Sequence, residues 1–412
     1  VSIANIQYLP IELISVQSAN DTFFINENRK IGRRSFDLPP DYELYFFRNS
    51  KIDKPISLNL SDLKINYKII GMRDTITSVV FPFSNIDDIS NEEYVLKKPS
   101  NNHDFNFLIT NENEKTIRLK VGEWDITKSV ILPEGYEIIA SENTTLNLLN
   151  ESMIISNSPL KFYGSNDKPI LITSTDSTGK GLYILKTSRS TFKNVVFNNL
   201  DSPSFGNWSL SGSVSFYKAP VRFEKCIFSN NRSEDALNTI KSKFEIVKCH
   251  FQNIYSDAFD ADFCNGSLSS SSFKNIGNDA IDVSGTFCSL EKIKIHNAND
   301  KAISIGEESK ALLDSIQISN SEICLASKDL STIEGNNIVI YDSKIGISAF
   351  QKKAEFGPGA VYLSNYRTQN VFEEFLIEDG SIVEVNESII DTDIKNVKNL
   401  LYGNLHGKAT KK

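Results

Sequence analysis

The chain has 412 residues, of which 40% are hydrophobic and 23% are charged, and it carries a formal net charge of -8 with a pI near 5.3. This composition is typical of a core-forming protein, and 20 Gly with 12 Pro are too few for a collagen-like or low-complexity chain. The acidic balance argues against nucleic acid as the main partner, because phosphate contacts need clustered Lys and Arg, and no apolar run approaches the ~18 residues of a membrane span.

The first predicted element is a small domain over residues 1–85. Short alternating runs such as 11–16 and 63–70 are separated by polar turns, which is typical of half-buried antiparallel strands. We therefore predict a β-sandwich-like domain. Residues 86–114 are polar and aperiodic and are predicted to be a linker. The chain opens with Val rather than Met, which favours a mature form or a fragment.

From residue 115 the chain repeats itself with a period of about 22 residues. A bulky apolar residue recurs in each repeat, and an Asn or Asp follows it two positions later. The apolar column is Phe197, Phe228, Phe251, Phe273, Ile295, Ile318 and Ile340, and the polar column is Asn199, Asn230, Asn253, Asn275, Asn297, Asn320 and Asp342. Such columns arise when rungs of short parallel strands stack ~4.8 Å apart, because equivalent residues then lie on top of one another.

The fold class follows from these columns. Apolar columns fill the interior, and Asn tolerates the left-handed backbone of a tight corner and can form a ladder of amide hydrogen bonds. We predict an all-β chain in which residues 115–412 form a right-handed, single-stranded parallel β-helix of about 12 rungs. The five cysteines, Cys226, Cys249, Cys264, Cys288 and Cys324, show no CxxC pair and are predicted to be small core fillers.

A second register follows the Asn corners and repeats every 22 residues. Its inward column is Leu237, Phe259, Ile281, Ile303, Leu325 and Ile347. Strand alternation then predicts that the neighbouring columns point outward. One of these is small (Ala236, Ala258, Ala280, Ala302), and the other is polar (Asn238, Asp260, Asp282, Ser304). We expect a flat trough, with carboxylates beside small side chains, in which a sugar polymer could lie across several rungs.

Asp260, Asp262 and Asp282 are the candidate catalytic carboxylates, as acid/base or metal-binding groups. Cα atoms of the stacked pair Asp260 and Asp282 should lie ~4.8 Å apart, and those of Asp260 and Asp262 ~6.6 Å apart. These values bracket the carboxyl separations of retaining and inverting glycosidases, ~5 Å and ~6.5–9.5 Å. Lys301 and Lys328 are candidate catalytic cations, which would neutralise a uronate carboxylate in a β-elimination or a C5-epimerisation.

The candidate substrate-binding residues are Asn238, Asp257, Asp279, Ser304, Lys352 and Trp208. Trp208 lies in the insert 201–219, which is predicted to wall the trough and to stack on a sugar. The corner residues Asp257 and Asp279 have a structural alternative, since Asp often caps turns. No cofactor is assigned, although the acidic cluster has the oxygen ligands that Ca²⁺ prefers.

The repeat resembles the right-handed parallel β-helix (pectate-lyase-like) superfamily of pectate lyases, polygalacturonases and alginate epimerases, over residues 115–400. The resemblance lies in architecture, because the polygalacturonase signatures NTD, DD and GHG and the DPHD of mannuronan epimerases are absent. The strings SDAFDAD, NDAIDVSG and QKKAEFGPG also look like a β-helix module associated with bacterial CotH-type envelope proteins, a likeness that implies no activity.

These observations together predict an extracellular or cell-envelope protein of bacterial type that binds a polysaccharide along the trough. As an enzyme it would be a polysaccharide lyase, a glycoside hydrolase or an epimerase. The alternative is a non-catalytic carbohydrate-binding or structural cell-surface module, because one fold serves both. The sequence assigns neither the sugar nor an oligomeric state.

Overall fold

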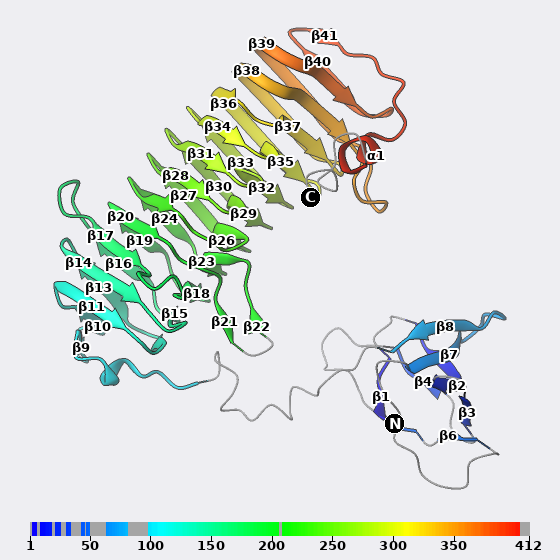
Figure 1. Cartoon of the computed structure of the whole chain (residues 1–412), viewed down its shortest axis with the longest axis horizontal. Coiled ribbons are helices and arrows are strands. Elements are labelled where there is room, and N and C mark those ends of the chain that lie inside the picture. The colour runs from blue at the N-terminus through cyan, green and yellow to red at the C-terminus, as the bar shows by residue number, and fades with distance from the viewer. Residues whose placement is uncertain are drawn as a thin grey trace. The chain divides into compact units, whose positions relative to one another are not determined.

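The computed structural model describes residues 2–5, 9–18, 21–25, 30–33, 43–45, 47–49, 63–80, 98–205 and 208–403. The chain divides into two compact units, Val1–Ser90 and Asn91–Lys412 (Figure 1). Within the described residues, no helix combines the length and the apolar character that crossing a bilayer requires.

The first unit is an antiparallel β domain. Its strands are β1 (Ser2–Ile3), β2 (Ile11–Ser18), β3 (Asp21–Ile25), β4 (Lys30–Ile31), β5 (Glu43–Leu44), β6 (Phe47–Arg48), β7 (Leu63–Ile69) and β8 (Ile76–Val79). A sheet runs in the order β6-β3-β2-β7-β8 with β4 on β2, and β1 pairs with β5. Alternation along β2 buries Ile11 and Leu13 against Ile25 and Tyr67, as the sequence pattern predicted.

The second unit is a right-handed parallel β-helix of about 12 turns, which confirms the predicted fold class (Figure 1). Each turn places one strand on each of three faces. The first face holds β10 (Thr116–Leu119), β13 (Glu137–Ser141), β16 (Leu160–Tyr163), β19 (Ser190–Lys193), β24 (Val221–Glu224), β27 (Lys243–Val247), β30 (Asn265–Ser269) and β33 (Phe287–Glu291). The second face holds β11 (Gly122–Ile126), β14 (Thr144–Leu148), β17 (Ile170–Thr173), β20 (Val195–Asn198), β25 (Ile227–Ser229), β28 (His250–Ile254), β31 (Ser272–Ile276) and β34 (Lys294–Ala298).

The third face carries the candidate site. It holds β12 (Val130–Leu132), β15 (Met153–Ser156), β18 (Gly181–Leu185), β23 (Gly212–Tyr217), β26 (Asp235–Ile240), β29 (Asp257–Asp262), β32 (Ile281–Ser284), β35 (Lys301–Gly306) and β37 (Ile323–Lys328). Towards the C-terminal end, the longer strands β36 (Lys310–Ser319), β38 (Thr332–Phe350) and β39 (Ala360–Ile377) continue from one face to the next, and β40 (Ile382–Val385) and β41 (Ser388–Ile389) follow.

The predicted apolar column fills the core. Phe197, Phe228, Phe251 and Phe273 are buried and paired in register, and their rings stack with centroids 4.8, 4.6 and 4.7 Å apart at successive steps. The five cysteines are buried free thiols, as predicted for core fillers. Stacked rings at this spacing bury apolar area continuously from turn to turn, which is the main source of the unit's stability.

The Asn column forms the corner after the second face. Asn253, Asn275 and Asn297 have φ values of 54°, 57° and 65°, the left-handed conformation that the sequence predicted. Each amide donates to the one below it, with Asn275 Nδ2 3.0 Å from Asn253 Oδ1 and Asn297 Nδ2 3.1 Å from Asn275 Oδ1. The ladder fixes the corners of successive turns in register.

The segment predicted to be a linker, 86–114, divides in the structure. Residues 81–97 lie outside the described part of the chain. The rest joins the β-helix: the 3-10 turn Asn102–Asp104 precedes β9 (Leu108–Asn111), which pairs antiparallel with β10. Asn101 donates to the carbonyl of Ser129 (2.9 Å) and accepts from the backbone of Ile131 (2.7 Å). This segment therefore covers the first turn.

Candidate functional site

One outward-facing column runs the length of the third face and changes character along it. The stacked residues are Ile131, Ile155, Tyr183, Ser215, Asn238, Asp260, Asp282, Ser304, Ala326, Ser348 and Leu376. Apolar residues stand at both ends and carboxylates in the middle. The two ends are covered by other parts of the chain, so that the acidic stretch lies between two walls.

The N-terminal wall is formed by Leu210, which directly follows the short hairpin of β21 (Ser204–Phe205) and β22 (Trp208–Ser209). Leu210 packs on a cluster formed by Met153, Ile155, Tyr183 and Leu185. The predicted insert 201–219 is too long, since Gly212–Tyr217 is strand β23 of the stack and only the residues before it leave the repeat. The side chain of Trp208 lies outside the described residues, so its predicted contact with a sugar stays a prediction.

The C-terminal wall is the helix α1 (Val397–Tyr402). Val397 and Leu401 pack on Ala326, Phe350 and Leu376 of the third face. The neighbouring column residue Ser304 is fully buried. Ser304 was predicted to bind substrate because of its position in the outward column. In this structure its side chain is enclosed.

The small-residue column was predicted to point outward, and this prediction is wrong. Ala236, Ala258, Ala280 and Ala302 are all 0% exposed and belong to the main core cluster. Strict alternation fails there because these residues follow the corner directly: the register pairs Asp235 with Asp257 and resumes only at Leu237 with Phe259. The alanines are small because the corner brings the backbone close to the core, and they do not line a trough.

Asp260 is the central carboxylate of the acidic stretch. Asn238 Nδ2 donates to Asp260 Oδ2 at 2.8 Å and to Asp235 Oδ2 at 2.9 Å. Burial raises the pKa of Asp260 well above its usual range, and the nearby carboxylates of Asp235, Asp262 and Asp282 raise it further. Burial raises the pKa of Asp235 to about 6. Asp260 therefore keeps its proton to a higher pH than an ordinary aspartate does.

Asp262 and Asp282 stand beside it on the same face. Asp282 is the register partner of Asp260 on the next turn, so their Cα atoms are ~4.8 Å apart. Asp262 lies two residues further along the strand, and burial followed by the charges of Asp282 and Glu307 raises its pKa. The structure thus brings together the three predicted catalytic carboxylates, all of them partly exposed.

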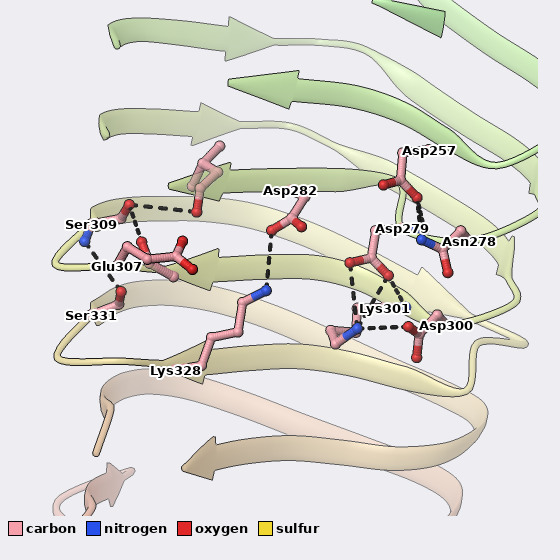
Figure 2. A network of polar contacts seen from close by, with 12 residues as sticks. Asp257, Asn278, Asp279, Asp282, Asp300, Lys301, Glu307, Ser309, Lys328 and Ser331 are labelled. Carbon is pink, nitrogen blue, oxygen red and sulfur yellow. Dashed lines mark hydrogen bonds and ion pairs between the residues drawn. The ribbon is translucent and has the colours of Figure 1, made fainter. Parts of the chain in front are cut away.

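The corner carboxylates Asp257 and Asp279 hold successive turns together. Asp257 Oδ1 accepts from the backbone N–H of Asp279 (2.8 Å) and from the amide of Asn278, and Asp279 Oδ1 accepts from the backbone N–H of Lys301 (2.9 Å) (Figure 2). These bonds favour the structural alternative for both. Burial raises the pKa of Asp257 to about 6.

Both predicted catalytic lysines are enclosed in ion pairs (Figure 2). Lys301 is 3% exposed, and its Nζ lies 2.7 Å from Asp300 Oδ2 and 3.4 Å from Asp279 Oδ1. Burial raises the pKa of Asp279 to about 7, although the positive charge of Lys301 lowers it in part. Burial also lowers the pKa of Lys301, but the carboxylates of Asp279 and Asp300 outweigh this effect and raise the pKa above its usual value. Lys328 is also 3% exposed and reaches Asp282 Oδ1 at 3.4 Å.

Lys352 lies at the C-terminal edge of the site. Asp329 Oδ1 accepts from the backbone N–H of Lys352 and of Lys353, at 2.7 Å each, and so shapes the loop. The Lys352 ammonium lies 5.5 Å from the ring centroid of Tyr402, and burial together with the charges of Lys328 and Lys301 lowers its pKa. Of the predicted cations, Lys352 is the least enclosed.

Sequence reasoning missed Asp300, Glu307 and Tyr402. Asp300 directly precedes Lys301 in the sequence, and this adjacency could have indicated an ion pair at the corner. Glu307 pairs with Lys353 at the edge of the face. Tyr402 comes from α1, which lies outside the repeat, and nothing in the periodicity places it near Lys301. In the described ranges, no three His, Cys, Asp or Glu side chains gather as a metal ion would require.

We expect the β-helix to lose stability as the pH rises from about 5 to about 8. Asp235 and Asp257, with pKa values of about 6, and Asp279, at about 7, titrate near 3.8 when unfolded. The folded chain therefore binds more protons than the unfolded chain does. The stabilisation from these protons is complete below the pKa of the unfolded state, and it is lost as the pH rises through the pKa values of the folded state. Asp176, whose pKa is lowered to about 2, titrates below this window.

Urea unfolding followed by tryptophan fluorescence measures this, since both Trp residues of the chain belong to the second unit. The double variant Asp235→Asn/Asp260→Asn should show a flatter pH dependence than the unsubstituted chain. A midpoint that rises between about pH 5 and about pH 8 would contradict the assignment.

Comparisons with known proteins assign the chain to no family. No family model and no curated protein matches the chain. Similar solved structures include the periplasmic alginate epimerase AlgG (11% identity, TM-score 0.34, covering 68% of this chain and 78% of that one). The surface adhesin PfbA of Streptococcus pneumoniae gives 12% identity and a TM-score of 0.29, covering 69% of this chain and 90% of that one. The catalytic domain of a GH87 α-1,3-glucanase in complex with nigerose gives 11% identity and a TM-score of 0.32, covering 96% of this chain and 90% of that one. Scores this low carry no argument about the fold or the activity of this chain.

Proposed function

We propose that the chain binds a polysaccharide across the open part of the third face and hydrolyses it with a carboxyl pair centred on Asp260. The observation that supports this is the stacking of Asp260 on Asp282 as register partners. Burial raises the pKa of Asp260, whereas Asp282 is paired with Lys328. Carboxyls with different environments at this spacing can divide the roles of acid and base.

In this proposal Asp260 is the general acid that protonates the leaving oxygen of the glycosidic bond. Asp282 is the partner carboxylate, and its ~4.8 Å Cα spacing from Asp260 is close to the carboxyl separation of retaining glycosidases. Asp262, ~6.6 Å along the strand, is the alternative partner and would leave room for a water molecule, as in an inverting enzyme. Asn238 holds Asp260 in place through its amide.

Hydrolysis fits the lysines better than β-elimination or epimerisation does. Those reactions need a cation that contacts the uronate carboxylate, whereas Lys301 is enclosed between Asp279 and Asp300 and Lys328 is engaged by Asp282. We propose that Lys301 and Lys328 position the carboxylates, and that Lys352 at the edge contacts the ligand. An extracellular or cell-envelope location remains part of the proposal.

The non-catalytic alternative has its own observation in favour. Asn238 joins Asp235 and Asp260 in one hydrogen-bonded set, and the corner aspartates bond to the next turn, so that much of the cluster is internally satisfied. A face of this kind would bind sugar hydroxyls without chemistry.

The test is an activity screen against neutral and acidic polysaccharides, with and without Ca²⁺, that reads new reducing ends and unsaturated-uronate absorbance together. We expect new reducing ends without absorbance, and a loss of about 100-fold in rate for Asp260→Asn. Asp167→Asn, an exposed carboxylate away from the face, is the matched control and should be fully active.

Single Asp282→Asn and Asp262→Asn variants separate the two partner assignments, since only the true partner should lose activity as strongly as Asp260→Asn. Full activity of Asp260→Asn would exclude the proposed acid. If the chain binds a glycan but forms no product, the non-catalytic binding module is the correct function.

A further inference from the structure

The second face carries a surface of the opposite electrostatic character. One outward column is His250, Ser272, Lys294, Gln317, Val339 and Arg367, and the other is Gln252, Lys274, His296, Ser319, Tyr341 and Gln369. These twelve positions, called the basic face below, are all described, and none of them is Asp or Glu. This is unexpected in a chain with a formal net charge of -8.

The cations of the basic face are accessible to a ligand. Lys274, Lys294 and Arg367 are exposed, and none of them takes part in an ion pair with another described residue. Lys301 and Lys328 of the third face are buried in ion pairs, whereas the three cations of the basic face are exposed to solvent. A surface that keeps several unpaired charges of one sign attracts the opposite charge.

Two histidines on the face are held in defined orientations. His250 Nδ1 lies 2.7 Å from Ser272 Oγ, and His296 Nδ1 lies 3.0 Å from Ser319 Oγ. Both rings are exposed. Because Nδ1 is engaged by the next turn in both cases, Nε2 is the ring atom left for a ligand.

A hollow of about 510 Å³ lies next to this surface, at the corner between the first and second faces. Lys225, Lys248 and His250 line it together with the amides of Asn166 and Asn194. Lys225 and Lys248 occupy the same corner position on successive turns, with φ values of 54° and 56°. The hollow therefore adds two stacked cations to the end of the basic face.

We propose that the basic face binds an anionic polysaccharide that runs along the helix axis, with its carboxylate or sulfate groups on Lys274, Lys294 and Arg367. Lys274 and Lys294 stand on adjacent turns, ~4.8 Å apart along this axis, and Arg367 lies three turns beyond Lys294. A linear polymer with repeated anionic groups can therefore contact all three cations. The interleaved Gln252, Gln317 and Ser272 supply the amides and hydroxyls that sugar hydroxyls need.

The composition of the face favours a polysaccharide over the other polyanions. Single-stranded nucleic acid binding uses several aromatic platforms, and the two columns contain one aromatic residue, Tyr341. A membrane surface would need apolar anchors, and Val339 is the one exposed apolar residue of the two columns. This site is separate from the third face and does not rest on the function proposed above.

The experiment measures binding of the full chain to polygalacturonate and to heparin, with dextran as a neutral polymer and with single-stranded DNA and anionic vesicles as competing polyanions. We expect binding to one or both acidic polysaccharides, no binding to dextran, and weakening as salt is added. The double variant Lys274→Ala/Lys294→Ala should weaken binding about tenfold or more, because each lysine loses a charged hydrogen bond.

The matched control is Lys120→Ala/Lys395→Ala, which removes the same charge from exposed lysines away from the face and should change affinity less than about twofold. All four lysines are exposed, so neither double variant should disturb the fold. Unchanged tryptophan fluorescence of each variant would verify this. Equal weakening by the control, tighter binding to DNA or vesicles, or no binding to either acidic polymer would overturn the proposal. Asp260→Asn should leave this binding intact, which separates it from the third-face activity.

Discussion

Phe251→Ala is expected to lower the free energy of unfolding of the β-helix by about 3–5 kcal/mol. The Phe251 ring is sandwiched between Phe228 and Phe273, with centroids 4.6 and 4.7 Å away, and it is 1% exposed. Truncation removes both stacking contacts and leaves a cavity that the rigid ladder of corners prevents from closing.

Urea unfolding of the second unit, followed by tryptophan fluorescence, measures the loss. Phe251→Leu keeps part of the volume and should cost less than Phe251→Ala. Phe372→Ala is the matched control, since Phe372 is 83% exposed and should change stability by less than about 0.5 kcal/mol. A loss at Phe251 as small as at Phe372 would show that the stack is not the source of stability.

Lys301→Met is expected to destabilise the β-helix by about 3–5 kcal/mol at about pH 8. Methionine keeps much of the side-chain volume but leaves the carboxylates of Asp279 and Asp300 enclosed without their cation. The loss should shrink at about pH 5, because Asp279, with a pKa of about 7, is then protonated and no longer needs a counter-charge.

Two further variants test the cause of this loss. Adding Asp279→Asn to Lys301→Met should recover part of the stability at about pH 8, since it removes one uncompensated charge. The matched control is Lys310→Met: Lys310 and Glu334 form an ion pair with side chains 46% and 45% exposed, and breaking it should cost less than about 1 kcal/mol. If Lys301→Met is as mild as Lys310→Met, the buried network contributes no stability.

The stacking of Asp260 on Asp282 could be predicted because it follows from the period alone. A repeat of 22 residues fixes which residues lie on top of one another, and the Phe column and the Asn corners were predicted for the same reason. The inward position of Ala236 was not predicted, because strand alternation says nothing about the corner that precedes the strand.

The enclosure of Lys301 could not be predicted either. It depends on Asp300, which lies in the corner, and on Tyr402, whose ring centroid is 5.9 Å from the Lys301 ammonium and which is about 100 residues further along the chain. Helix α1 has no counterpart in the repeat, so no column assigns it a place. Contacts within the repeat can thus be predicted from its period, whereas the place of α1 on the third face cannot.

The two walls also define a length. Leu210 covers the third face at Tyr183, and α1 covers it from Ala326 onwards, so the stretch between them is measured in whole turns of the helix. Inserting or removing one 22-residue turn between them would change that stretch by ~4.8 Å while every other turn keeps its neighbours. The length of polymer that the site can contact therefore changes only in steps of one turn, and it is set by the number of turns between the two walls.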